Sequence, residues 1–196
     1  MTEAGDSPDG LALLHAAHAG FEMRLRRVGP GDWERPTPCA GWDIHTLVNH
    51  IVGGNRRYVL LLGGASAEDT NRTREVDHLG VDPVTAFLTT AAQVEAAFNE
   101  DGALSRTVDH RFGERTGAQL LALRVLDMTV YAWDVAQALG VDDTLGPAAI
   151  EFALAHANEV ERLRIHGVFA TPSMPLSADA SPLERLLHLT GRSAVA

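Results

Sequence analysis

The sequence predicts an all-α fold, an antiparallel helical bundle with short additional helices. Apolar residues recur at the three-and-four spacing of amphipathic helices along most of the 196 residues. Alternating strand patterns are almost absent. Gly and Pro separate the helical stretches by short loops, which favour antiparallel packing of long helices. We expect residues 1–196 to form a single domain.

The first two helices have recognisable ends. The first is predicted to begin at residues 7–8 (Ser-Pro), because proline is favoured at the first helical position, and to stop at residues 29–30 (Gly-Pro). The second is predicted to begin at Asp43, a good N-cap residue. Its apolar face consists of Ile44, Leu47, Val48, Ile51 and Val52.

Two longer stretches follow. The third helix is predicted to open at residues 82–83 (Asp-Pro) and to end at Gly102. Residues 105–117 show no helical period, and we expect them to be extended or looped. The fourth helix is predicted from about Thr116 to Gly140, a length that suits the central member of a bundle.

The C-terminal part is predicted to contain two more helices. One starts near Pro147 and continues through Leu163. After a tail at residues 167–180, Ser181 and Glu184 form a capping box around Pro182, and Gly191 closes the last short helix.

Composition and charge restrict the function. The formal net charge is −10, whereas a nucleic-acid-binding protein needs a basic face. All 16 basic residues are arginine, and the clusters at residues 24–27 and 56–57 are interpreted as solvated helix faces. No apolar run approaches the roughly 20 residues of a membrane span, and no signal peptide is visible. We therefore expect a cytoplasmic protein with no nucleic-acid or membrane partner.

Cys39 is the only cysteine, so no intramolecular disulfide can form. Because it precedes a helix, a reactive thiolate is one interpretation. We favour the other, a small buried residue.

Several polar residues are predicted to lie on apolar helix faces. His50 shares the buried face of the second helix, where a hydrogen-bonded histidine and a ligand are the alternatives. Asp127, Tyr131 and Asp134 follow one stripe of the fourth helix. Buried carboxylates need partners, so Asp127 with Tyr131 indicates a polar pocket or a metal site. For Asp134 we favour a cap on a neighbouring helix or an ion pair with it, with Arg124 or Arg162 as candidates.

The remaining motifs are weak. His15 and His18 lie on the apolar side of the first helix and fit either the core or a pocket wall. Residues 53–54 and 63–64 are Gly-Gly pairs, but neither follows a strand, so they are not phosphate loops. No ligand role is predicted for four further histidines, His45, His110, His156 and His188.

Larger segments resemble a known family. Residues 37–43 (TPCAGWD) and 47–54 (LVNHIVGG) resemble the TPCxGW…LVxHxxGG segment of DinB-like proteins, which group with the N-terminal domain of mycothiol-dependent maleylpyruvate isomerase. Residues 132–140 (AWDVAQALG) resemble its HGWDLARATG helix. Residues 167–170, 179–187 and 190–192 resemble its usual C-terminal ending.

This resemblance implies a DinB-type four-helix bundle and a divalent metal, zinc or nickel, held by three side chains. These map to His50, Asp127 and Tyr131, but the family has histidine where Tyr131 stands. A phenol must lose a proton of pKa near 10 before it ligates a metal. We therefore expect the three side chains to meet in one cavity and to bind metal weakly or not at all.

Two functions follow from the resemblance, and we favour an enzyme. The first is a metal-associated transferase or isomerase that uses a mycothiol-like thiol on a small molecule. The alternative is a metal-free enzyme or binding protein that reuses the cavity, for instance in secondary metabolism, with His50, Asp127 and Tyr131 as acid and base groups. A regulatory or structural bundle is the third class. The full isomerase carries a further C-terminal domain, so we do not expect maleylpyruvate isomerisation itself. A homodimer is compatible with the sequence.

Overall fold

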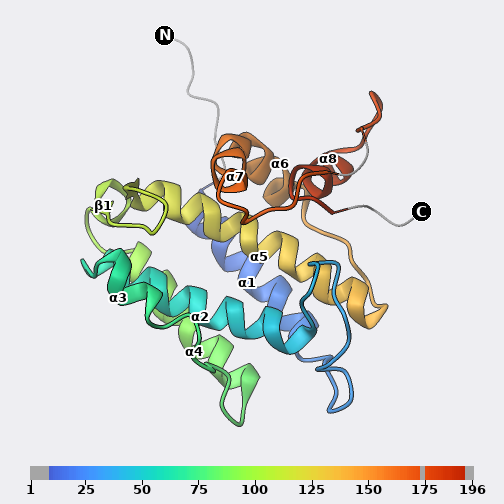
Figure 1. Ribbon diagram of the computed structural model, residues 1–196, viewed down its shortest axis with the longest axis horizontal. Coiled ribbons are helices and arrows are strands. Elements are labelled where there is room, and N and C mark those ends of the chain that lie inside the picture. Colours follow the sequence, from blue (N-terminus) through green and yellow to red (C-terminus); the bar gives the residue numbers. More distant parts are fainter. Residues whose placement is uncertain (1–8, 173–174, 193–196) are drawn as a thin grey trace.

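A computed structural model describes residues 9–172 and 175–192 of the chain. Four long helices dominate it: α1 (Gly10–Leu25), α2 (Ile44–Leu62), α4 (Pro83–Phe98) and α5 (Gly117–Leu139). Figure 1 shows α5 running across the molecule beside α1 and α2. The expected all-α class is confirmed, whereas the antiparallel four-helix arrangement stays a prediction.

Helix α5 is the centre of the fold. It packs against α1, α2 and α6 (Pro147–Ala155), and most of its side chains are buried. Its first turn is fixed by a capping box between Thr116 and Gln119, and its end by Gly140 at a φ of 67°. The predicted bounds of this helix are therefore confirmed, because both signals are local.

The shorter elements were less predictable. The structure adds α3 (Ala67–Asn71), which the sequence analysis missed. Residues 105–117 contain a small antiparallel hairpin, as expected of an extended or looped segment. Its strands are β1 (Thr107–Val108) and β2 (Arg115–Thr116), and the short 3-10 helix η1 (Ala103–Ser105) precedes them.

The helix predicted from Pro147 is divided in two. It breaks after α6, and the chain continues as α7 (Ala157–Arg164). At the break, the Nδ1 of His156 lies 2.8 Å from the carbonyl oxygen of Phe152. No glycine or proline marks this point, so the periodicity alone predicted one continuous helix.

The predicted start of the last helix is confirmed, whereas the predicted start of the first helix is not tested. Helix α8 (Pro182–Leu189) begins with the expected Ser181–Glu184 capping box and packs on α6. The predicted start of the first helix at residues 7–8 lies outside the described residues, and α1 is described from its N-cap Asp9. Among the described residues, no helix is long and apolar enough to cross a membrane.

Candidate functional site

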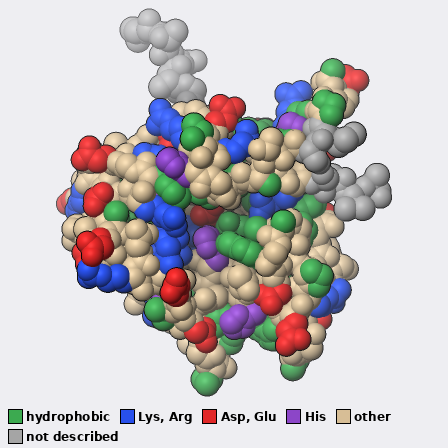
Figure 2. Space-filling view, viewed as in Figure 1, with side chains coloured by type: hydrophobic (Ala, Val, Ile, Leu, Met, Phe, Trp, Pro, Cys, Tyr) green, Lys and Arg blue, Asp and Glu red, His purple; other side chains and the backbone are tan. Residues whose placement is uncertain are grey.

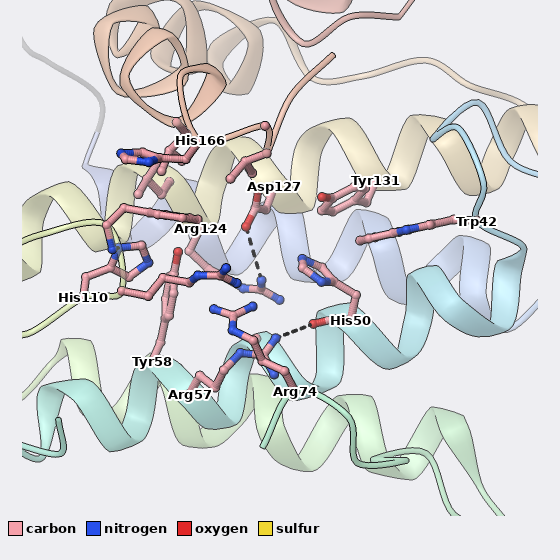
Figure 3. Close-up of a pocket in the computed structure, with 17 residues that line it drawn as sticks. Trp42, His50, Arg57, Tyr58, Arg74, His110, Arg124, Asp127, Tyr131 and His166 are labelled. Atoms are coloured by element: carbon pink, nitrogen blue, oxygen red, sulfur yellow. Dashed lines mark hydrogen bonds and ion pairs between the residues drawn. The ribbon is translucent and has the colours of Figure 1, made fainter. Parts of the chain in front are cut away.

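A cavity of about 330 Å³ opens between α2 and α5. The segment after α3, the β1–β2 hairpin and the chain that follows α7 complete its wall (Figure 3). All three predicted site residues line it: His50 from α2, and Asp127 and Tyr131 from α5. Their convergence was expected from the two inward-facing stripes. Their chemical roles stay predictions.

An aromatic cluster forms one end of this cavity. The ring of Trp42 lies 4.7 Å from that of His50 and 6.0 Å from that of Tyr131, between centroids. The His50 and Tyr131 rings meet edge to face at 5.6 Å. The family-like loop at residues 37–43 places Trp42, because its carbonyl accepts hydrogen bonds from the backbone and hydroxyl of Thr37, both 2.9 Å long.

Burial sets the protonation of these groups. It raises the pKa of Asp127 to about 6, although Arg124 at 3.7 Å favours the carboxylate. It also raises the pKa of Tyr131 well above its ordinary value, so that side chain is a phenol at neutral pH. Burial, assisted by three nearby arginines, lowers the pKa of His50 to about 3. The site therefore offers a carboxylate near its pKa, a neutral imidazole and a phenol donor.

The sequence analysis missed the most abundant group in the cavity, arginine. Arg57 of α2 and Arg124 of α5 are only 6% and 1% exposed, and both line the cavity with Arg74 and Arg111. The interpretation of Arg57 as a solvated residue was therefore wrong, although its neighbour Arg56 is exposed. His110 and His166 also line the wall.

The glycine pair at residues 53–54 explains how buried arginines fit there. A Cβ atom on Gly54 would lie 2.8 Å from Nη1 of Arg124, and one on Gly53 would lie 2.8 Å from Nη1 of Arg57. Any larger residue would need these guanidinium groups to move. The pair lies within α2 and is not a phosphate loop, as predicted. Its position one turn before Arg57 was the feature of the sequence that could have indicated buried arginines packed closely against this helix.

Asp134 forms the predicted ion pair, but with a different partner. Its carboxylate accepts three hydrogen bonds from Arg192, at 2.6, 2.9 and 3.1 Å, and both side chains are buried. The expected partners Arg124 and Arg162 were wrong, because Arg162 pairs with Glu159 and Arg124 approaches Asp127. The guanidinium of Arg192 also lies over the Tyr131 ring, 5.5 Å from its centre.

Three other residues named in the sequence analysis, Cys39, His18 and Arg24, lie outside the cavity wall and have structural roles. Cys39 is half-buried, and burial raises the pKa of its thiol, which favours the small buried residue over a thiolate. His18 is buried beside Glu95, whose carboxylate lies 2.6 Å from its Nδ1. Arg24, expected in solvent, is buried and donates to the carbonyl oxygens of Gly20 and Thr144.

The residues present do not fit the divalent metal that the resemblance implies. In the described ranges, no group of three or more His, Cys, Asp or Glu side chains is placed to hold a metal ion. His50 and Asp127 provide two donors, while the Tyr131 phenol holds its proton. The guanidinium of Arg124 beside Asp127 would repel a cation. Metal ligation by these three residues stays a prediction.

Comparison with known proteins agrees with this architecture. A family model described as the mycothiol maleylpyruvate isomerase N-terminal domain matches residues 14–136. The chain belongs to this family. The matched region contains His50, Asp127 and Tyr131, so all three predicted site residues lie within it.

Individual relatives cover most of the chain. The uncharacterized proteins Rv0738 and MT0763 of two Mycobacterium tuberculosis strains (ATCC 25618 / H37Rv and CDC 1551 / Oshkosh) are each 29% identical over 187 residues, 94% of this chain and 98% of theirs. Crystal structures of the mycothiol-dependent maleylpyruvate isomerase and of a mutant of it match with a TM-score of 0.63. They cover 82% of this chain and 72% of the isomerase at 18% identity, which shows a shared fold.

Proposed function

We propose that the chain is a thiol-dependent enzyme of the isomerase or transferase type, acting on a small molecule in the cavity between α2 and α5. The observation that carries the proposal is the meeting of His50, Asp127 and Tyr131 in that cavity. Family membership supports the use of a mycothiol-like thiol. The solved relatives are named for maleylpyruvate, and this chain is proposed to take a different electrophile.

The three side chains suit addition of a thiol to an activated double bond. Asp127, with a pKa of about 6, is mostly ionised at neutral pH and accepts the thiol proton. The thiolate forms a bond to the alkene carbon, and the π electrons move to the conjugated carbonyl oxygen. The Tyr131 phenol donates a hydrogen bond to that oxygen.

The outcome of the addition decides the reaction type. If the new single bond rotates and the thiolate then leaves, the double bond returns in the other configuration, and the proton returns to the sulfur. If the carbon is protonated instead by Asp127, the thiol stays attached, and the net reaction is the addition of the thiol across the double bond, an S-conjugation of the transferase type. His50, neutral because its pKa is about 3, positions the electrophile against Trp42.

The test is turnover of a panel of cis-configured unsaturated keto acids and esters, including maleylpyruvate, followed by proton NMR with mycothiol, with glutathione and without thiol. We expect mycothiol-dependent conversion of at least one compound. Asp127→Asn should slow it by about 100-fold or more, as expected for loss of a general base. Asp101→Asn, an exposed aspartate outside the cavity, is the matched control.

Two results would contradict the proposal. Conversion that proceeds equally without thiol, or equally in Asp127→Asn, would remove the thiol or the carboxylate from the mechanism. Failure of every electrophile to react would favour the binding-protein alternative for the same cavity.

A further inference from the structure

Arg192, which follows α8 and lies outside the cavity wall, contacts the tyrosine of the predicted site. The centre of its guanidinium group lies over the Tyr131 ring, 5.5 Å from the ring centre. Both side chains are buried, with 8% and 4% of their residue surfaces exposed. A guanidinium group within about 6 Å of an aromatic ring is attracted by the negative face of the ring. The contact therefore joins a buried cation to a phenol of the cavity wall.

The chain after α8 turns back so that Arg192 reaches α5. Gly191 has a φ of 75°, a conformation that favours glycine, and a Cβ atom there would lie 2.5 Å from the carbonyl oxygen of Ala170. After this turn, the backbone nitrogen of Arg192 donates to the carbonyl oxygen of Leu187 at 2.8 Å. The Nη1 atom donates to the carbonyl oxygen of Thr190, also at 2.8 Å. The position of Arg192 is therefore fixed by its own segment.

Asp134 fixes the guanidinium group over the ring. It follows Tyr131 by three residues on α5, so the two side chains lie on the same face of that helix. Its carboxylate accepts hydrogen bonds from Nε and Nη2 of Arg192. With Nη1 on Thr190, all three nitrogen atoms of the guanidinium group donate to oxygen atoms other than the Tyr131 hydroxyl. The contact with Tyr131 is thus made through the ring face, and the hydroxyl is left to the cavity.

The charge of Arg192 makes the phenol more acidic. Burial and the carboxylates of Asp127 and Asp134 raise the pKa of Tyr131, whereas the positive charge of Arg192 lowers it. Figure 3 shows the Tyr131 oxygen directed into the cavity, on the side of Asp127. Figure 2 shows that this face of the molecule is hollowed at its centre, so a substrate can reach the cavity from solvent.

We infer that Arg192 is a positioning residue for Tyr131: it holds the phenol ring in place and strengthens the hydrogen bond that the hydroxyl donates to the substrate oxygen during thiol addition. The role in turnover rests on the proposed function, whereas the effect on the phenol can be measured without substrate. A donor that faces a developing negative charge contributes most when it is fixed in advance. Asp134 supplies that fixing, and Arg192 supplies the charge.

The test measures the ionisation of the phenol directly. In the full chain, 3,5-difluorotyrosine is incorporated at position 131, and its fluorine NMR signal is followed as the pH is raised. The fluorine atoms withdraw electrons, so this phenol ionises at lower pH than tyrosine. In the double variant Asp134→Leu with Arg192→Met, the midpoint should rise by roughly 0.5 pH units or more, because Arg192 affects the pKa of Tyr131 more than Asp134 does. This variant leaves no charge of the pair buried and unpaired.

Three further variants separate this effect from a loosened fold. Arg192→Lys keeps the charge, so its midpoint should lie closer to wild type than that of the double variant. Asp134→Asn removes the carboxylate and leaves the charge of Arg192, so its midpoint should fall. Arg185→Gln, at an exposed position of α8, should leave the midpoint unchanged.

A merely structural role predicts a different pattern. Loosening of the fold would expose Tyr131 to water and lower the midpoint in the double variant and in Asp134→Asn alike, since burial raises the pKa of this phenol. An unchanged or lowered midpoint in the double variant therefore overturns the inference. A rise of the same size in Arg185→Gln also overturns it.

Turnover is measured separately. With the thiol and an electrophile that reacts, the double variant should reduce kcat by about tenfold with little change in KM, because the phenol acts on the transition state. A raised midpoint with an unchanged kcat would overturn the role in turnover. A raised midpoint without any thiol-dependent reaction would reject the proposed function and keep the action of Arg192 on Tyr131. Thiol-dependent conversion with an unchanged midpoint would do the reverse.

Discussion

The buried pair of Asp134 and Arg192 provides a quantitative test of how the fold is held together. It joins α5 to the segment after α8 through three charge-assisted hydrogen bonds. Removing one partner of such a pair leaves the other charged and buried, which typically costs about 3–5 kcal/mol. Asp134→Ala should lower the free energy of unfolding by that amount. For a chain of this length, the melting temperature should fall by about 6–20 °C.

Urea denaturation followed by circular dichroism measures this loss of stability. Two further variants test whether the loss comes from leaving one buried charge unpaired. Glu22→Ala removes the half-buried partner of the exposed Arg26 on α1 and should cost at most about 1 kcal/mol. The double variant Asp134→Leu with Arg192→Met replaces both charges by apolar groups and should recover most of the stability. If the free energy of unfolding of Asp134→Ala lies within about 1 kcal/mol of wild type, the pair does not stabilise the fold as proposed. If the double variant is as unstable as Asp134→Ala, the loss does not come from an unpaired buried charge.

Two predictions concern the cavity. Tyr131→His should strengthen zinc and nickel binding relative to wild type, because a neutral imidazole ligates without losing a proton; equal affinity in calorimetric titrations of wild type and variant would contradict this. The pKa of Asp127 is about 6 in the folded protein, above its ordinary value of 3.8. The folded state therefore holds this proton more tightly than the unfolded state. The resulting contribution to the free energy of unfolding is fully present below pH 4 and is lost as the pH rises through 6. Relative to Asp127→Asn, wild type should therefore lose up to about 3 kcal/mol between pH 4 and 7 in urea denaturation, and a pH-independent difference would show that its pKa is not raised.

The helix ends and the faces on which residues lie could be predicted from the sequence, because both depend on residues within one helix. Capping residues such as Thr116 and Ser181 fixed helix starts within a residue, because their side chains bond to the first turn of the same helix. The stripe positions of His50, Asp127 and Tyr131 also follow from helical geometry alone, so their meeting in one cavity could be expected.

Features that depend on distant partners could not be predicted. The partner of Asp134 lies 58 residues away, and the nearer arginines were the wrong choice. The burial of Arg57 depends on space left by two glycines and on Arg124 from another helix. The cationic cavity combines residues from α2, α5 and two loops, and a sequence pattern within one element carries no information about such a convergence.

We propose that the chemistry takes place in the cavity between α2 and α5. An apolar groove of about 360 Å³ between α6 and α8, lined by Leu145, Ile150 and Leu183, is the alternative location. Backbone NMR chemical-shift mapping with mycothiol distinguishes the two sites. We expect saturable shifts centred on His50, Arg57 and the middle of α5, whereas shifts confined to the α6–α8 groove would place the chemistry there instead.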